Sequence, residues 1–169
     1  QPFTEQSRNN QLAATAYAQI ADDVEIAKRQ FGQDRVAVVI GTSTSGIAAG
    51  ETAMLAKLQQ GQWPENFDYR QQEMAAPALF LAKLAQVDGP TFAVSTACSS
   101  SARALMTARN LLETNLADAV IVGGVDSLCR MTLRGFTALE SVSAGYCKPF
   151  AQDRDGINIG EAAALFLLQ

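Results

Sequence analysis

Four short apolar runs divide the sequence, and stretches with helical spacing lie between them. The runs are RVAVVI, TFAVST, AVIV and AAALFLLQ, which begin at Arg35, Thr91, Ala119 and Ala162. Short runs of this kind, bounded by turn residues, are typical of buried strands. Strands that alternate with helices predict an α/β layered fold, in which helices cover both faces of a largely parallel sheet.

The stretches between the runs have apolar residues at helical spacing. Residues 10–31 follow this spacing and are closed by Gly32, so we expect one amphipathic helix there. A second helix is expected after Pro77, a residue that suits a first helical turn. A third is expected from Cys98 to Thr114, with six residues on one face: Ser101, Ala104, Leu105, Ala108, Leu111 and Leu112.

Charge and composition exclude several classes of function. A net charge of -4 and scattered Lys and Arg residues leave no footprint for nucleic acid. No apolar stretch reaches the ~18 residues that span a bilayer, so we expect no membrane segment. The three cysteines lack close-pair spacing, which argues against a disulfide framework and a CxxC metal site and favours a reducing cytoplasm.

Histidine is absent from the chain. Imidazole is the most frequent general base near neutral pH and a common metal ligand. Any nucleophile in this sequence must therefore borrow its base or use Lys or Glu.

One cysteine stands where nucleophilic chemistry is favoured. In VSTACSSSARAL, residues 94–105, a strand leads into a turn and Cys98 begins the next helix. Unpaired amides and the positive end of the helix dipole favour a thiolate there, and the same amides can donate to an oxyanion on an attached acyl carbon. From spacing alone, the opposing interpretation is a small buried side chain between Ala and Ser.

The segment TACSSS after a strand resembles the active-site signature of the β-ketoacyl synthases, with Cys98 in the place of the acyl-accepting cysteine. Three further segments are similar to motifs of this family, in the same order: RVAVVIGTSTSG, DAVIVGGVDS and CKPFAQDRDGINIGEAAALFLL. In the last, Lys148 and Ala151 replace the usual Arg and Asp, and five residues match the pattern: Arg154, Asp155, Gly156, Gly160 and Glu161.

The resemblance implies a thiolase-like fold and an acyltransferase of the elongating class, as in fatty acid, polyketide or aryl polyene synthesis. An acyl chain would pass from the phosphopantetheine arm of an acyl carrier protein to Cys98 as a thioester. Decarboxylation of malonyl-carrier protein would supply the carbanion that attacks this thioester. The partner carries the phosphopantetheine, so the resemblance implies no cofactor and no metal in the chain itself.

In this family two histidines and a lysine support the reaction, and they come from the C-terminal half. We therefore expect residues 1–169 to be a partial N-terminal domain that is inactive alone, with Cys98 as its one catalytic residue. The family's first strand is also missing, and we expect its place at the centre of a five-stranded sheet of order 3-2-1-4-5. Its loss would leave open edges, as in a segment of a longer polypeptide.

Family members dimerise through the strand before the cysteine, which here lies between Thr91 and Thr96, so the resemblance implies a homodimer or a heterodimer. This surface keeps a second hypothesis open, a non-catalytic interaction module. Cys98 argues against a partner of the chain-length-factor type, which lacks the cysteine. A third hypothesis, a Cys-Glu-Lys amide hydrolase, needs no histidine, but none of its motifs is present.

Two glycine segments are weak candidates for ligand binding. Gly41 and Gly46 have the spacing of a phosphate loop, but Ile47-Ala48 stands where such a loop needs Lys and Ser or Thr. Gly123-Gly124 predicts a turn that closes the third strand, where compact or positive-φ residues are needed.

The remaining chemical side chains are interpreted as structural. Cys129 and Cys147 are expected to be inert thiols. Three acidic residues near Arg154 are expected in a salt-bridged loop and not in a metal site: Asp153, Asp155 and Glu161. Three aromatic residues are expected to form a packed cap and not a ligand platform: Trp63, Phe67 and Tyr69.

Overall fold

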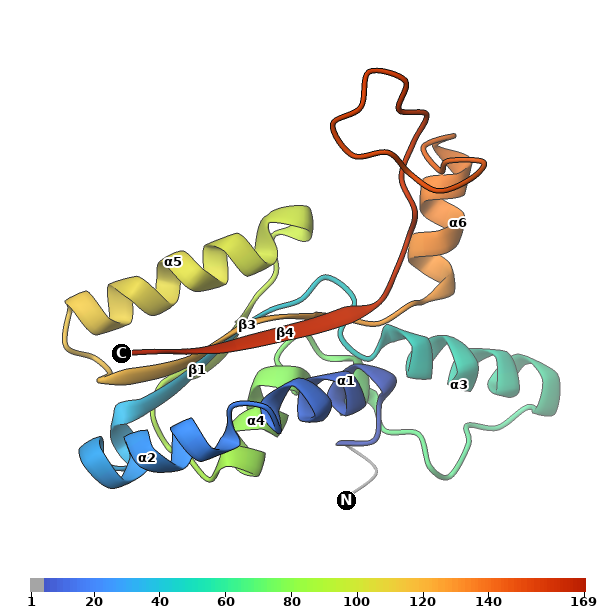
Figure 1. Cartoon of the computed structure of the whole chain (residues 1–169). Helices are drawn as coiled ribbons and strands as arrows, with labels where there is room; N and C mark the ends of the chain where they lie inside the picture. The colour runs from blue at the N-terminus through green and yellow to red at the C-terminus, as the bar shows by residue number, and fades with distance from the viewer. Residues whose placement is uncertain (1–4) are drawn as a thin grey trace.

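The computed structural model describes residues 5–169, and its four strands form one mixed sheet (Figure 1). The strands are β1 (Val36–Gly41), β2 (Thr91–Val94), β3 (Ala119–Asp126) and β4 (Ala162–Leu168), in the order β2-β1-β3-β4. β1 runs parallel to β2 and β3, and β4 runs antiparallel to β3. The expected mixed, mostly parallel sheet is therefore confirmed.

The centre of this sheet is continuous. β1 pairs directly with β3 along its whole length, from Val36 opposite Ala119 to Gly41 opposite Gly124. The observed order is the expected order 3-2-1-4-5 with strand 1 left out, since β2, β1, β3 and β4 stand in the places of strands 3, 2, 4 and 5. The open edges expected at the centre are not found, because the backbone groups of β1 and β3 satisfy each other directly.

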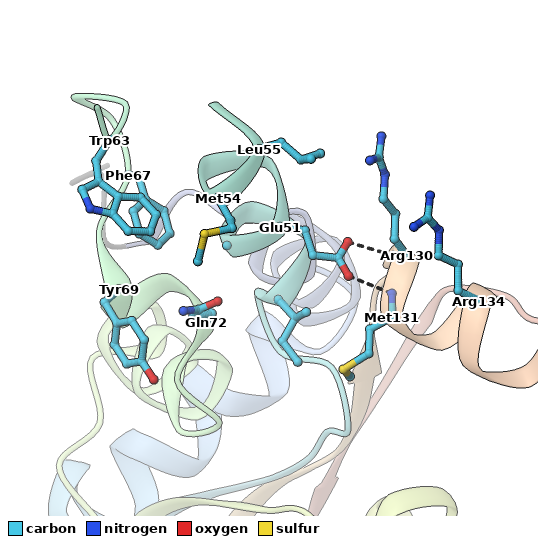
Figure 2. A pocket seen from close by; sticks show the side chains of 12 residues that line it. Glu51, Met54, Leu55, Trp63, Phe67, Tyr69, Gln72, Arg130, Met131 and Arg134 are labelled. Atoms are coloured by element: carbon cyan, nitrogen blue, oxygen red, sulfur yellow. Dashed lines mark hydrogen bonds between the residues drawn. The ribbon is translucent and has the colours of Figure 1, made fainter. Parts of the chain in front are cut away.

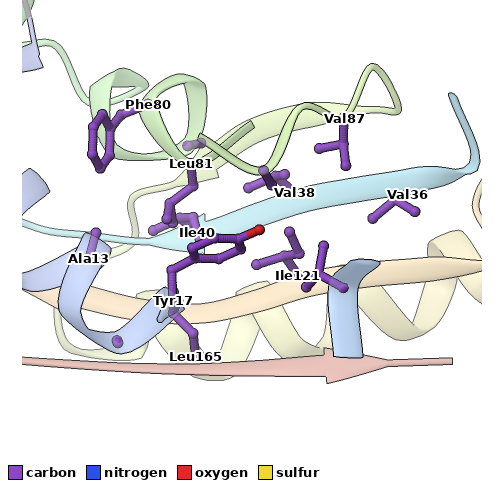
Figure 3. Packing of buried hydrophobic residues seen from close by; sticks show 14 of the residues in the cluster. Ala13, Tyr17, Val36, Val38, Ile40, Phe80, Leu81, Val87, Ile121 and Leu165 are labelled. Atoms are coloured by element: carbon purple, nitrogen blue, oxygen red, sulfur yellow. The ribbon is translucent and has the colours of Figure 1, made fainter. Parts of the chain in front are cut away.

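Three helices cover one face of the sheet: α1 (Arg8–Tyr17), α2 (Ala21–Phe31) and α4 (Ala76–Ala85). Their apolar sides enclose the larger core, which includes Tyr17 and Leu81 from the helices and Val38, Ile40 and Ile121 from the strands (Figure 3). α4 begins with Pro77 in its first turn, as the sequence predicts. This face holds most of the fully buried side chains.

The opposite face is covered by α5 (Ser100–Glu113) (Figure 1). Ala104, Ala108 and Leu111 of this helix pack against Val39 and Val122 of the sheet. Small residues at the contact let the helix lie close to the strands. Ser101 and Leu105 lie on the same side of α5, but they line a cavity beside β3 and remain exposed.

The helix predicted over residues 10–31 is in fact two helices. After Tyr17 the chain forms tight i to i−3 hydrogen bonds, from the Gln19 amide to Ala16 and from the Ile20 amide to Tyr17, before α2 begins. The break directs α1 onto α4 and β4, and α2 onto β1 and β3. Periodicity alone cannot reveal it, because the apolar residues keep helical spacing on both sides of the break.

The Gly123-Gly124 pair lies inside β3 and does not form the predicted turn. Neither residue has a positive φ. A Cβ at Gly123 would lie 2.0 Å from the carbonyl oxygen of Ala164 in β4, and one at Gly124 would lie 2.0 Å from Oγ of Ser101 in α5. At Gly123 the obstacle is backbone, so glycine is required there for close packing and not for backbone freedom. At Gly124 the nearest atom belongs to a serine side chain.

Two further helices lie beyond the carboxyl ends of the parallel strands: α3 (Ile47–Gln60) and α6 (Arg130–Ala138). α6 and the loop of residues 141–160 project away from the sheet (Figure 1). Two aromatic side chains of this loop, Tyr146 and Phe150, are almost fully exposed. Within residues 5–169, no helix has the length and apolar character needed to cross a membrane.

Candidate active site around Cys98

A sharp turn presents Cys98 at the carboxyl end of β2. Ala97 has a φ of 54°, a left-handed conformation that is uncommon for a residue with a Cβ. The segment Ala97–Ser99 is a single 3-10 turn, η4, and α5 follows it directly. Cys98 is exposed, so the interpretation of this residue as a buried packing group is wrong.

Hydroxyl groups of the TACSSS segment hold this turn in place. Oγ of Ser100 donates to the carbonyl of Ala97 at 2.6 Å and accepts the amide of Thr96 at 2.9 Å. Oγ of Ser99 donates to the carbonyl of Thr96 at 2.8 Å. The Ser100 hydroxyl is thus the acceptor for the Thr96 amide, and both hydroxyls reinforce carbonyls that also accept backbone amides, those of Ser99 and Ser100.

The loop after β1 supports the turn from outside. Oγ of Ser43 donates to the carbonyl of Ala97 at 3.0 Å. Ser43 is itself held by Asp126, the last residue of β3, whose Oδ1 accepts the Ser43 amide at 2.7 Å and the Thr44 amide at 2.9 Å. The hydroxyls of Thr42 and Thr44 also donate to this oxygen, at 2.9 and 3.0 Å.

Asp126 and Ser43 are the residues of this site that the sequence analysis missed. Ser43 follows the carboxyl end of β1, and Asp126 is the last residue of the neighbouring parallel strand β3. Side chains at this position of a parallel sheet meet at one edge, which is where α/β folds commonly bind ligands. The hydroxyl-rich segment GTSTSG after one strand and the aspartate that ends the next were the available signal.

Gly41 brings α5 close to the end of β1. A Cβ on Gly41 would lie 2.6 Å from the carbonyl carbon of Ser100 and from the backbone nitrogen of Ser101. A side chain at this position would therefore displace the start of α5 and the Cys98 turn with it. This close approach explains why the GTSTSG segment needs a glycine at its first position.

A cavity of about 430 Å³ lies beside the start of α5. It is lined by Ser101 and Leu105 of α5, by Asp126 at the end of β3, and by Glu161 and Phe166 near and within β4. Ser101 lies only three residues after Cys98. The site therefore adjoins an open, partly apolar surface of the sheet.

Glu161 is the charged residue at the edge of this cavity. Its Oε1 accepts Nε and Nη2 of Arg8 at 2.9 and 2.6 Å, and its Oε2 accepts the Leu128 amide at 3.2 Å. The hydrogen bond from Arg8 is the main cause that lowers the pKa of Glu161, followed by the bond from Leu128. The same contact raises the pKa of Arg8.

The loop before β4 contains an ion pair, as predicted, but its cation is Lys148 and not the neighbouring Arg154. Asp153 pairs with Lys148 at 2.6 Å, and Asp155 accepts Oγ of Ser143 at 2.8 Å. Arg154 donates to the carbonyl of Ala151 at 3.0 Å. In residues 5–169, no group of three or more His, Cys, Asp and Glu side chains could hold a metal ion.

A larger cavity, of about 930 Å³, lies between α3, the segment of residues 61–72 and the start of α6 (Figure 2). Both carboxylate oxygens of Glu51 accept amides of α6, from Arg130 at 2.8 Å and from Met131 at 2.7 Å. This contact caps α6, which has no capping bond from its own N-cap residue. Glu51 therefore fixes one wall of the cavity.

The aromatic residues of the 61–72 segment form the opposite wall (Figure 2). Trp63 and Phe67 stack, with ring centroids 5.4 Å apart. Trp63 and Tyr69 are nevertheless exposed to the cavity. The prediction of a packed cap is therefore wrong, because these rings line an open pocket and do not close one.

The other two cysteines lie in different surroundings. Cys129 is buried, and its Sγ lies 3.3 Å from Oγ1 of Thr132. Cys147 is partly exposed in the loop before β4. All three cysteines have free thiols. Only Cys98 combines exposure with the start of a long helix.

Comparison with known proteins gives a consistent set of relatives. The model of the β-ketoacyl synthase N-terminal domain matches residues 4–169. The 3-oxoacyl-[acyl-carrier-protein] synthase 2 of Staphylococcus aureus is 26% identical over 171 residues, covering 96% of this chain and 42% of the relative. Nodulation protein E of Rhizobium meliloti is 29% identical over 136 residues, covering 80% of this chain and 34% of the relative.

The fold is also similar to solved structures. A structure of a ketosynthase in complex with its chain length factor, from Xenorhabdus doucetiae, contains a chain that is 46% identical, with a TM-score of 0.90. The match covers 98% of this chain and 42% of that one. Both matches cover nearly all of this chain but only about two fifths of the longer relative.

Proposed function

This chain belongs to the β-ketoacyl synthase family through its N-terminal domain, and from that premise we propose that Cys98 is the acyl-accepting nucleophile of a β-ketoacyl-acyl carrier protein synthase. Sγ of Cys98 bonds to the acyl carbon, and the thiol of the carrier leaves. Malonyl-carrier protein then loses CO₂, and its C2 carbanion attacks the acyl carbon. The Cys98 thiolate leaves, and the product is a 3-ketoacyl thioester on the carrier.

The observation that carries this proposal is the turn at Ala97. It places an exposed thiol at the start of a 14-residue helix, where backbone dipoles stabilise negative charge. No acceptor for the backbone N–H of Cys98 occurs among the described residues. This N–H is therefore available to an oxyanion on the acyl carbon, the kind of contact that lowers the barrier of acyl transfer.

The proposed substrates are acyl and malonyl thioesters presented by an acyl carrier protein. The Staphylococcus aureus relative, 3-oxoacyl-[acyl-carrier-protein] synthase 2, supports this partner by its name. The phosphopantetheine arm belongs to the carrier, so the chain needs no cofactor of its own in this reaction. Three free thiols suit a reducing compartment, and we place the chain in the cytoplasm.

The chain contains no histidine, so the proposed general bases of decarboxylation lie outside these 169 residues. A second subunit is also part of the proposal. β2 pairs with β1 on one side, and among the described residues no strand pairs with its other edge. That edge can add the same strand of a second copy or of a related subunit, and the Xenorhabdus doucetiae ketosynthase in its complex with a chain length factor supports a heterodimer.

A non-catalytic interaction module is the second candidate function, and the absence of histidine favours it. The two candidates differ in the reactivity of Cys98. We would alkylate the chain with limiting iodoacetamide and follow each cysteine by peptide mass spectrometry. The catalytic proposal expects Cys98 to react at least about tenfold faster than buried Cys129 and clearly faster than partly exposed Cys147.

A Cys98→Ser variant controls for labelling at other sites. Equal rates at Cys98 and Cys147 would remove the support for a nucleophile and leave the interaction module. In a parallel assay with acyl- and malonyl-carrier protein, the chain alone should form no 3-ketoacyl product. Appearance of that product would disprove the assignment of the bases to residues outside the chain.

A further inference from the structure

The loop after β1 is organised around one carboxylate oxygen. Oδ1 of Asp126 accepts two successive backbone amides, those of Ser43 and Thr44. It also accepts the hydroxyls of Thr42 and Thr44. Hydrogen bonds to an ionised acceptor are stronger than neutral ones, so this single group sets the path of three consecutive residues.

The same loop reaches the residue that precedes Cys98. The backbone of Ser43 is bound to Asp126, and its hydroxyl donates to the carbonyl of Ala97 at 3.0 Å. Ala97 has a φ of 54°, which disfavours a residue with a Cβ and persists only where surrounding contacts hold it. Within the turn, the amide and the hydroxyl of Ser100 both donate to the Ala97 carbonyl, and Ser43 supplies the contact from outside the turn.

We propose that Asp126 is a positioning residue for Cys98, acting through the Ser43 hydroxyl on the Ala97 carbonyl. This inference rests on the proposed function of Cys98 as the nucleophile. Asp126 need not touch the substrate or transfer a proton. Its carboxylate holds Ser43 so that the strained turn keeps the Cys98 thiol at the start of α5, with its backbone N–H free.

The alternative role for Asp126 is a direct effect of its charge on the Cys98 thiolate. The two roles predict opposite signs. A negative charge near a thiolate disfavours it, so neutralising Asp126 would make Cys98 more reactive if charge were the dominant effect. If Asp126 acts by position, neutralising it loosens the turn and makes Cys98 less reactive, and Ser43→Ala does the same with no change of charge.

The test is residue-resolved alkylation of the full chain with iodoacetamide, comparing the wild type with Asp126→Asn, Ser43→Ala and the double variant. Asp118→Asn is the matched control. Asp118 lies just before the first residue of β3, and its carboxylate accepts a hydrogen bond from Nε of Arg35 at 2.6 Å. Cys147 serves as an internal standard, and thermal unfolding followed by circular dichroism checks that each variant is folded.

We expect Asp126→Asn and Ser43→Ala each to slow Cys98 alkylation by about tenfold, which corresponds to about 1.4 kcal/mol, with the Cys147 rate unchanged. The double variant should be no slower than Asp126→Asn, because both changes interrupt one path. Asp118→Asn should lower the melting temperature and leave the Cys98 rate as in the wild type.

Faster or unchanged alkylation of Cys98 in Asp126→Asn overturns the inference, as does an unaffected rate in Ser43→Ala. If Asp126→Asn fails to fold, Ser43→Ala alone still tests the inference, because it leaves all four hydrogen bonds to Oδ1 of Asp126 in place. The two proposals fail in different measurements. The proposed function fails if Cys98 and Cys147 are alkylated at equal rates in the wild type. This inference fails if the Cys98 alkylation rate is not lower in the variants than in the wild type.

Discussion

Arg8 and Glu161 join the first residue of α1 to the residue before β4 across 153 residues of sequence, with Nη2 of Arg8 lying 2.6 Å from Oε1 of Glu161. The second carboxylate oxygen of Glu161 accepts the Leu128 amide just after β3. One carboxylate therefore links α1, the entry of β4 and the segment that leads into α6. Its protonation should weaken all three contacts together.

This ion pair predicts a pH-dependent contribution to stability. Because Arg8 lowers the pKa of Glu161, the contribution is present above the pKa of an unfolded glutamate, about 4.3, and is lost as the pH falls through the lower folded value. Glu161→Gln should lower the melting temperature at neutral pH, and the difference from wild type should vanish in acid. Glu113→Gln, in an exposed i,i+4 pair, is the control. A constant difference across the pH range would contradict the assignment.

Gly41 predicts a steric requirement beside the nucleophile. Gly41→Ala places a Cβ 2.6 Å from two backbone atoms of α5, so we expect a loss of about 2 kcal/mol in unfolding free energy and slower alkylation of Cys98. Gly135→Ala, within α6 and free of neighbours within 4 Å, should be neutral or stabilising by up to about 1 kcal/mol. Urea unfolding measures both, and equal stability of the two variants would refute the close approach.

Glu51 is predicted to hold α6 in its observed position. Glu51→Ala removes the acceptor of two amides at the start of α6, and such a loss costs about 1 kcal/mol of helix stability. Hydrogen exchange should therefore become faster in Arg130–Ala138, with α5 unaffected. Glu113→Ala, which removes an exposed partner of Arg109, should leave α6 unchanged. Unaltered exchange in α6 of the Glu51 variant would show that the helix is held by other contacts.

Two leucines of α4 provide a matched test of the core. Leu81 is 0% exposed and lies within the larger core, whereas Leu79 is 54% exposed on the same helix. Leu81→Ala should lower the unfolding free energy by about 2–5 kcal/mol through lost burial and a cavity. Leu79→Ala should change it by less than about 0.5 kcal/mol. Similar values for both would mean that α4 does not pack on the sheet as described.

Much of the secondary structure follows from local patterns. The apolar runs at β1 and β4 are strands within one residue of their predicted bounds, and Pro77 stands in the first turn of α4 as expected. Such elements are predictable because their buried side chains recur along the sequence with the period of the helix or strand that they belong to. The break between α1 and α2 was not predictable, since it depends on which strands each helix contacts.

The sequence by itself determined the family and the position of the candidate nucleophile, because both are carried by contiguous motifs such as TACSSS around Cys98. Only the tertiary structure decided how that cysteine is held. Gly123 is needed for the close approach of β4, and hydrogen bonds connect Asp126 to Ser43 and Ser43 to the Ala97 carbonyl. The reason is physical: a hydrogen bond or a close approach joins residues that the sheet brings together, and their separation along the chain carries no local signal of it.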